Sequence, residues 1–468
     1  MTGRQNIRKE ELFARTPVPK ALFTMAIPTI ISQIINLVYN MVDTFFIGRT
    51  GNSYMIAATT ITLTMIMMCV ALANLFGIGG GSQVARLMGR GDHETAKKVS
   101  AFAVYGAIAI ALVYSLLIGL FLDPVLIFLG ASDATIDYAR SYAIIVIVIG
   151  GLPGILSMSL AHLLRNAGFS AQASVGLSMG SILNCALDPL FMFVILPKGQ
   201  EVTGAALATA LSGTAACVYL IFAYIRAGRT SPLGLSLKGA LSLPKEQIRA
   251  VFAVGVPSAI LTGLFDLANI CVNILAAAHN DLVLAGMGIV MKVERIPNAV
   301  NIGICQGMLP IVAFNFASGD HERMKSVIKT ARNTGLIVSV ICIVFFEIFA
   351  APSSELFLST TAGDMKSAAL TVSLATLFLR IRAVASPVQF LNYHTSYCMQ
   401  AMGNGKYTML HAFVRELVFY IPLMFLLDFM FAETGLAAAL PAGEACGAMF
   451  ALYLLHRMLT GKYKKRGA

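Results

Sequence analysis

Long apolar runs are the feature that most limits what this chain can fold into. About twelve such runs occur in its 468 residues, centred near residues 33, 66, 109, 150, 183, 214, 260, 298, 339, 381, 417 and 447. About twenty consecutive apolar residues are needed to cross a hydrocarbon core of ~30 Å as a helix. Only 12% of the residues are charged, compared with about 25% in soluble domains. The sequence therefore predicts an all-α integral membrane protein with twelve transmembrane helices, whose short connections leave no room for a soluble catalytic domain.

Positively charged residues are distributed unevenly between the two sets of loops. Lys and Arg are frequent before helix 1, after helices 2 and 8, between helices 6 and 7, and at the C-terminal end of the sequence. The opposite set of loops holds only Arg49, Arg140, Lys198 and Lys366. Because loops rich in Lys and Arg stay in the cytoplasm, we expect a multi-pass protein of the cell membrane with both termini cytoplasmic. The net charge of +11 then reflects topology, and we expect no nucleic-acid partner.

Four short motifs recur in the same order about 230 residues further along the chain. They are Ala26-Ile27-Pro28 with Gly255-Val256-Pro257, Gly91-Asp92-His93-Glu94 with Gly319-Asp320-His321-Glu322, Asn166-Ala167-Gly168 with Ala401-Met402-Gly403, and Thr203-Gly204 with Thr434-Gly435. Collinear matches at one offset indicate duplication. Six helices, an even number, separate each residue from its counterpart, so the halves share one orientation, as in parallel-repeat transporters. We predict two six-helix lobes, 1–228 and 249–468, joined by a cytoplasmic linker at 229–248.

The repeated Gly-Asp-His-Glu tetrapeptide has a structural interpretation. Gly at the end of one helix, Asp as the N-cap of the next and Glu in its first turn would form a turn between two helices. We favour this turn over a metal-binding or catalytic role for His93 and His321. The eight cysteines lie in apolar segments without CxxC spacing, so we expect neither a disulfide framework nor a zinc site, and we expect no cofactor.

Two of the predicted helices carry polar stripes inside their apolar runs. At three- and four-residue steps, which place side chains on one helix face, helix 1 has Gln33, Asn36, Tyr39, Asn40 and Asp43, and helix 5 has Ser181, Asn184 and Asp188. Charged side chains inside the membrane are costly and mark functional candidates. Asp43 and Asp188 can face each other only if helices 1 and 5 line one cavity. Their oxygens suit Na⁺, and a low-dielectric cavity favours protonated carboxyl groups. Alternatively, Asp43 caps the end of helix 1 near Gly48, and Asp188 only precedes the kinking Pro189.

The second half has a different set of polar residues. They are Thr262, Asp266, Asn269 and Asn273 on helix 7, Lys292, Glu294 and Arg295 on helix 8, Arg380 and Arg382 on helix 10, Arg415 and Glu416 on helix 11, and Glu444 on helix 12. These side chains could bind substrate directly. They could also form structural pairs, for example Glu294 with an arginine of helix 10.

Several segments resemble the multidrug and toxic compound extrusion (MATE) family. The segment Met25–Pro28 with Asn40-Met41-Val42-Asp43-Thr44 resembles helix 1 of that family. Asn166-Ala167-Gly168 followed by Leu183-Asn184-Cys185-Ala186-Leu187-Asp188-Pro189-Leu190-Phe191 is similar to its helix 4–5 segment, and Gly204–Thr209 to its helix 6. The similarity covers most of the chain and is closest to the bacterial branch of DinF- and MepA-like proteins. It implies twelve helices in two parallel-repeat lobes.

The resemblance also implies a function and a set of site residues. It implies secondary antiport, in which organic compounds, cationic or amphipathic, are exported in exchange for H⁺ or Na⁺ by alternating access. We expect the protein to work as a monomer in the lipid bilayer. By the family pattern, Asp43 and Asp188 are the coupling carboxylates, Asn184 and Thr209 their polar partners in a possible Na⁺ site, and Pro28 the bend of helix 1. We assign to the substrate cavity Gln33, Asn36, Tyr39, Asn40, Asp266, Asn269, Asn273, Glu294 and Arg295. The acid that other branches carry on helix 10 is replaced by Arg380 and Arg382, so the choice between H⁺ and Na⁺ stays open.

Three other classes of protein are alternatives to this hypothesis. The first is a flippase for a lipid-linked saccharide from the same superfamily, which the intramembrane Lys and Arg residues would suit. A major-facilitator transporter lacks support because no acidic-arginine motif follows helix 2. An intramembrane enzyme lacks support because His162 and His394 join no catalytic pattern.

The duplication is unequal at the two candidate coupling acids. When the two halves are aligned, Asp43 corresponds to Val272, and Asp188 corresponds to Ile421. Both acids are therefore confined to the first half, and we expect that half to sense the ion.

Overall fold

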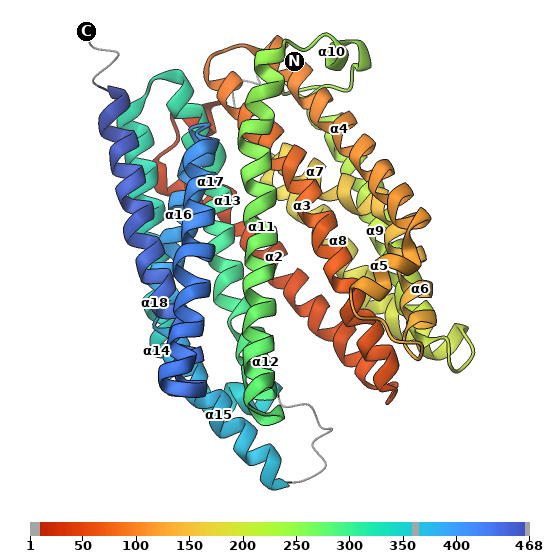
Figure 1. Cartoon of the computed structure of the whole chain (residues 1–468). Coiled ribbons are helices and arrows are strands. Elements are labelled where there is room, and N and C mark those ends of the chain that lie inside the picture. Colours follow the sequence, from red (N-terminus) through yellow and green to blue (C-terminus); the bar gives the residue numbers. More distant parts are fainter. Residues whose placement is uncertain (1–9, 358–364, 464–468) are drawn as a thin grey trace.

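The structure is a computed structural model that describes residues 10–357 and 365–463, and its described secondary structure is helical (Figure 1). The basic residues at 1–9 and 464–468, part of the topology argument, lie outside the described residues. The first half contains α2 (Val18–Gly48), α3 (Ser53–Gly89), α4 (His93–Leu120), α5 (Leu122–Phe128), α6 (Ile136–Ala143), η1 (Ile144–Ile149), α7 (Gly151–Asn166), α8 (Ser170–Leu190), η2 (Phe191–Ile195) and α9 (Glu201–Gly228). A short α10 (Leu237–Leu241) follows. The second half contains α11 (Lys245–His279), α12 (Asp281–Val293), α13 (Arg295–Ser318), α14 (His321–Phe357), α15 (Met365–Ala383), α16 (Ser386–Ala401), α17 (Gly405–Phe413), η3 (Val414–Tyr420) and α18 (Ile421–Tyr463).

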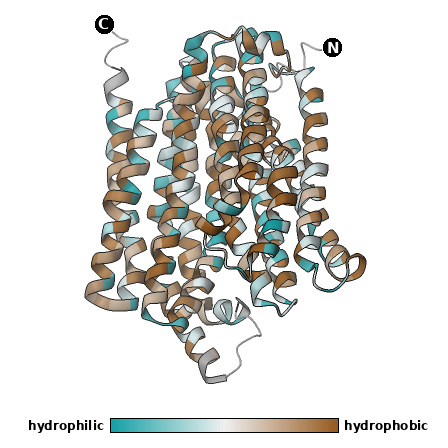
Figure 2. Ribbon diagram, turned by 45° about the vertical axis from the view of Figure 1, so that its right-hand side comes forward, coloured by the Kyte–Doolittle hydropathy of each residue, from teal (hydrophilic) through white to brown (hydrophobic). Residues whose placement is uncertain are grey.

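The predicted number of membrane spans agrees with the helices of the described chain. Nine helical segments are long and apolar enough to cross a bilayer, and two bent pairs, 136–149 with 151–166 and 368–383 with 386–401, bring the number to eleven. The segment 405–460 contains non-helical backbone at Ala432 and is long enough for two spans. Dividing it there gives twelve. Apolar residues cover the middle of the helices, as Figure 2 shows, so the prediction of an all-α membrane protein is confirmed.

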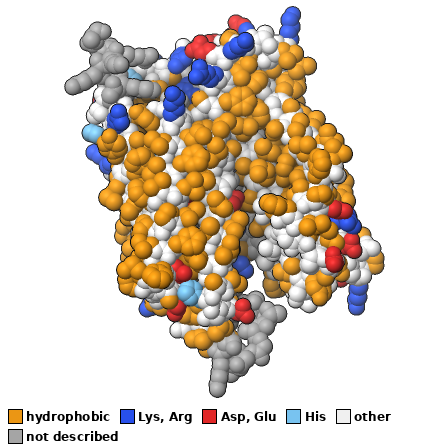
Figure 3. Space-filling model, in the orientation of Figure 1, with side chains coloured by type: hydrophobic (Ala, Val, Ile, Leu, Met, Phe, Trp, Pro, Cys, Tyr) orange, Lys and Arg blue, Asp and Glu red, His pale blue; other side chains and the backbone are white. Residues whose placement is uncertain are grey.

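The helices form two lobes that pack together near the chain termini. Across the lobes, α2 packs on α13 and α3 packs on α11. One apolar core at the terminal end joins residues of both lobes, for example Leu22 and Leu87 with Val251 and Met308. Two further cores each stay within one lobe, one among residues 47–206 and one among residues 268–440. A hollow between the lobes opens away from the termini (Figure 3). The two lobes are therefore joined at the terminal end and separated at the other.

The inter-lobe contact between α3 and α11 includes a direct approach of the two backbones. A Cβ atom on Gly79 would lie 2.5 Å from the carbonyl oxygen of Val251, and a Cβ on Gly255 would overlap the carbonyl oxygen of Leu75. Because glycine has no side chain, the two helix backbones can approach this closely. These glycines therefore permit a close approach of the two lobes along α3 and α11.

The repeated Gly-Asp-His-Glu loops are turns that cap helices. Gly91 and Gly319 have positive φ angles of 73° and 85°, a conformation that glycine adopts without strain. The carboxylate of Asp92 accepts a hydrogen bond from the amide of Thr95 at 3.0 Å, and Asp320 accepts from the amide of Arg323 at 3.0 Å. The predicted structural interpretation of both loops is confirmed.

Candidate functional site

The middle of the first lobe contains a buried polar group built on α8 and α9. Asp188 and Asn184 lie one turn apart on α8, and both are almost completely buried. The Asn184 amide lies 3.2 Å from the hydroxyl of Thr209 on α9. In the amide orientation that suits both neighbours, its nitrogen donates to Asp188 Oδ2 at 2.8 Å and its oxygen accepts from the Thr209 hydroxyl and amide at 3.2 and 3.1 Å. Asn184 therefore orients Asp188 and ties α8 to α9.

Asp43 reaches the same group from α2. It lies close enough to Asp188 for the two carboxyl groups to interact electrostatically. Its Oδ1 atom is buried and has no hydrogen-bond partner among the described residues. Asp43 lies inside α2, which continues to Gly48, and α8 continues beyond Pro189 into the π-helical η2. The two acids thus lie in one site, and their part in ion coupling stays a prediction.

Two tyrosines complete this site. Tyr39 on α2 and Tyr142 on α6 both lie near Thr209, Asp43 and Asp188. Tyr39 was expected from the helix 1 stripe, whereas sequence reasoning missed Tyr142. The available signal was a phenol inside the apolar run of helix 4, which is ambiguous because buried tyrosines are common core residues.

The donor set suits a small hard cation or a proton. Carboxylate, amide, hydroxyl and phenol oxygens converge from α2, α6, α8 and α9. Oxygen ligands of this kind are those that hard cations take. Within residues 10–357 and 365–463, no three His, Cys, Asp or Glu side chains are grouped as for a metal ion.

The remaining polar residues of helix 1 lie nearer the surface. Asn36 is exposed, and Gln33 and Asn40 are partly exposed. Asn40 donates to the carbonyl oxygen of Asn36 at 2.6 Å and to its side-chain oxygen at 3.1 Å. On α11, Asp266 and Asn269 are partly exposed and Asn273 is exposed. These residues are therefore at least partly exposed, and their assignment to a substrate cavity stays a prediction.

Buried charges of the second lobe form ion pairs. Arg382 donates from Nε and Nη2 to the two carboxylate oxygens of Glu294, both at 2.8 Å. This is a pair between helix 8 and a helix 10 arginine, the example considered from the sequence. Arg415 donates from Nε to Glu444 at 3.0 Å and lies 5.2 Å from the centre of the Tyr393 ring. Arg295, which follows Glu294 in the sequence, is exposed and interacts electrostatically with Asp266.

An apolar cavity of about 730 Å³ lies between α2 and α8. Its lining includes Pro28, Ile31 and Ile35 from α2 with Val175, Met179 and Ile182 from α8. Neither Asp43 nor Asp188 lines it. Because Pro28 forms part of the wall, a change in α2 at this proline would change the shape of the cavity.

The fold and the buried polar site define a helical membrane transporter with two repeated six-helix lobes. The model of the MatE family matches residues 28–190 and 257–426, one segment in each lobe, and the chain belongs to this family. Among its relatives, the multidrug export protein MepA of Staphylococcus aureus strain MSSA476 is 28% identical over 452 residues, 96% of each chain. MepA of Staphylococcus saprophyticus is 28% identical over 451 residues, with the same coverage.

Solved structures share the fold. A MATE protein in complex with MaL6 superimposes with a TM-score of 0.90 at 20% identity, covering 97% of this chain and 99% of that one. An outward-facing multidrug resistance MATE transporter superimposes with a TM-score of 0.89 at 20% identity, covering 97% and 98%. The predicted family and fold are therefore confirmed, and the chain is a transporter and not an enzyme.

Proposed function

We propose that this protein is a secondary antiporter that exports small organic compounds of the multidrug type in exchange for H⁺ or Na⁺. The single observation that carries this proposal is membership of the MatE family, with multidrug export proteins aligned over 96% of the chain. The hollow between the lobes supports alternating access, because closure at one end is combined with opening at the other. An ion moving down 100 mV supplies about 2.3 kcal/mol per charge, enough for an accumulation ratio of tens.

We assign ion coupling to the first-lobe site. A proton or Na⁺ that binds between Asp43 and Asp188 cancels one of the two neighbouring negative charges, and α2 carries one of the carboxyl groups. Neutralisation would therefore change how α2 packs on α8, and Pro28 is the point where a helix lacks one backbone hydrogen bond. A rearrangement there would reshape the adjacent apolar cavity and favour substrate release. The oxygen donors fit H⁺ and Na⁺ alike, so the ion is decided by experiment.

We place the protein in the cytoplasmic membrane of the cell. Its termini and the closed end of the lobes face the cytoplasm. Lys and Arg gather at that end on the face shown in Figure 3, as the positive-inside rule requires. The hollow then opens outward. We take the monomer as the functional unit, because both lobes needed for alternating access lie in one chain.

The flippase alternative is weakened by the ion pairs. It depends on a strongly basic cavity, but Arg382 and Arg415 are each paired with a glutamate. Arg380 lies 3.8 Å from Glu347. Pairing lowers the positive charge available to a phosphate-bearing saccharide carrier.

Drug efflux in everted vesicles tests the proposal. Asp43→Asn and Asp188→Asn should abolish transport driven by an ion gradient, whereas Asp133→Asn, at an exposed acid between α5 and α6, should leave it unchanged. Imposing a pH gradient or a Na⁺ gradient separately identifies the ion. Full gradient-driven efflux in both site variants would overturn the coupling assignment, and transport of lipid-linked saccharide without drug efflux would favour the flippase.

A further inference from the structure

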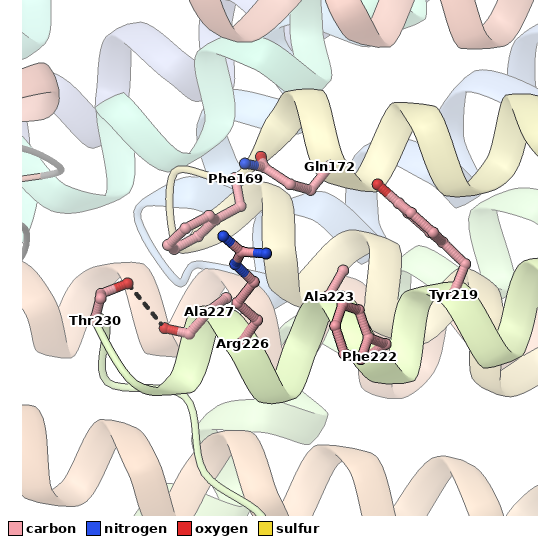
Figure 4. Close-up of a pocket in the computed structure, with 8 residues that line it drawn as sticks. All are labelled: Phe169, Gln172, Tyr219, Phe222, Ala223, Arg226, Ala227 and Thr230. Atoms are coloured by element: carbon pink, nitrogen blue, oxygen red, sulfur yellow. Dashed lines mark hydrogen bonds between the residues drawn. The ribbon is translucent and has the colours of Figure 1, made fainter.

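A second cavity lies at the end of the first lobe that carries the termini. It has a volume of about 430 Å³ and lies between the start of α8 and the last turns of α9. Its lining consists of Phe169, Gln172, Tyr219, Phe222, Ala223, Arg226, Ala227 and Thr230 (Figure 4). This volume falls within the range of small-ligand sites, roughly 300–1,000 Å³. The cavity is separate from the Asp43–Asp188 site and shares no lining residue with the cavity beside Pro28.

The polar groups of this cavity are suited to an anion. The guanidinium of Arg226 extends from α9 toward Phe169 and Gln172 at the start of α8 (Figure 4). Arg226 is exposed, its guanidinium has no hydrogen bond or ion pair with the described part of the chain, and none of the eight lining residues is acidic. The hydroxyl of Thr230 donates to the carbonyl oxygen of Ala227 at 3.3 Å. An unneutralised arginine in a cavity that also holds the amide of Gln172 and the phenol of Tyr219 favours a phosphate group.

The surroundings of the cavity are those of a membrane surface. Both α8 and α9 are long enough and apolar enough to span the bilayer, and they pack mainly on each other and on α2 and α7 of the same lobe. Phe222, Val218 and Val175 are 64%, 62% and 53% exposed. Exposed apolar side chains on a membrane span face lipid tails. A ligand in this cavity would therefore contact the Arg226 guanidinium at the end of α9 and the apolar side chains along α8 and α9.

We propose that this cavity binds the phosphate headgroup of an anionic phospholipid, with its acyl chains along the exposed face of α8 and α9. Basic sites between transmembrane helices at the membrane surface are known to take lipid headgroups. Charge complementarity selects an anionic lipid, because Arg226 has no internal partner. The apolar face beside it selects a lipid over a soluble anion. This inference depends on the membrane location of the chain and not on the proposed transport activity.

Lipid titration followed by native mass spectrometry tests the proposal on the purified full chain in detergent. The probes are phosphatidylglycerol, zwitterionic phosphatidylcholine and inorganic phosphate. Arg226→Gln should weaken phosphatidylglycerol binding about fivefold, the effect of one arginine at a lipid surface, and Arg226→Lys should retain most of it. The matched control is Arg229→Gln, which removes an exposed arginine three residues further on that does not line the cavity.

The outcomes separate the proposal from its rivals. The proposal is supported if phosphatidylglycerol binding falls only in Arg226→Gln. In that case the melting temperature should be unchanged, and phosphatidylcholine binding should differ little among the variants. Equal losses in Arg226→Gln and Arg229→Gln would mean general surface attraction and would overturn it. Unchanged binding in Arg226→Gln would also overturn it. Competition by millimolar inorganic phosphate would identify a soluble-anion site and refute the lipid assignment.

Discussion

Arg86 in the first lobe donates a hydrogen bond from Nη1 to the main-chain carbonyl oxygen of Gln400 in the second lobe, at 3.2 Å. The same nitrogen donates to the carbonyl oxygen of Ala401 at 3.2 Å, and Ser82 donates to Gln400 at 2.8 Å. On the other side of the interface, Asn315 of α13 donates to the carbonyl oxygen of Phe13 at 3.0 Å. Side chains of each lobe thus bond to backbone of the other at the end where the hollow is closed.

Removing Arg86 should favour the conformation open at the terminal end. Hydrogen bonds from a charged group are worth about 1.5–3 kcal/mol each, so Arg86→Gln should shift a two-state population about tenfold or more. Spin labels at the exposed positions Arg90 and Lys406, one in each lobe, would report a longer distance by electron paramagnetic resonance. The charge-matched control is Lys97→Ala, at an exposed lysine, which should leave the distance distribution unchanged. An unchanged distribution in Arg86→Gln would show that the Arg86 hydrogen bonds favour neither conformation.

Loss of the Tyr142 hydroxyl should impair ion-driven efflux without unfolding the protein. Tyr142→Phe keeps the ring that packs in the first-lobe core and removes the group near Thr209, Asp43 and Asp188. One neutral hydrogen bond is worth about 0.5–1.5 kcal/mol, so the rate should fall roughly two- to tenfold. Efflux assays should show no such loss in Tyr138→Phe, one turn earlier on α6 and partly exposed. Equal rates in both variants would remove Tyr142 from the site.

Breaking the Glu294–Arg382 pair should destabilise the second lobe strongly. Arg382→Met leaves a carboxylate without its bidentate partner, which costs about 3–5 kcal/mol for a buried pair. The double variant Glu294→Gln with Arg382→Met should recover most of the melting temperature. Arg380→Met, at a half-exposed arginine 3.8 Å from Glu347, should cost less than about 1 kcal/mol. If the double variant is stable but transports no substrate, the pair also has a binding role.

Asp92 should stabilise the protein at neutral pH and not at low pH. Hydrogen bonds from the amide and hydroxyl of Thr95 hold the pKa of Asp92 below its ordinary value. A carboxyl group whose pKa is lower in the folded state contributes stability above its unfolded pKa, and this contribution is lost as pH falls through the folded pKa. Asp92→Ala should therefore cost about 1 kcal/mol at pH 7 and nearly nothing near pH 2. Thermal melts at both pH values check this; a constant difference would contradict the capping role.

The overall fold could be predicted from sequence because each of its determinants is local or periodic. Span length follows from bilayer thickness, and the repeat offset follows from collinear motifs such as Gly91–Glu94 and Gly319–Glu322. The break at Ala432 could not be predicted, because alanine ordinarily favours the helix. Its φ of 51° lies in the left-handed region, which alanine rarely adopts.

The candidate site was only partly predictable. Asp43, Asn184 and Asp188 are polar residues in apolar runs, so they can be recognised as exceptions. Tyr142 and the Arg415–Glu444 pair required the structure, because the partners of a tyrosine or an arginine depend on contacts between distant helices. Arg86 was counted as a loop charge, but it is buried and bonds to the opposite lobe. Charge alone did not indicate that contact.

The glycine contact between α3 and α11 has a mechanical consequence. Gly79 and Gly255 bring the backbones of α3 and α11 into contact at one point, and side chains of the same helices meet on both sides of it, Asn74 with Thr262 and Gln83 with Gln247. A rotation of one lobe against the other would pivot about this closest point. A rotation of about 10° there would displace atoms roughly 20 Å away, near the far ends of ~30 Å spans, by roughly 3–4 Å. The smallest residue in the chain would then set the axis of its largest motion.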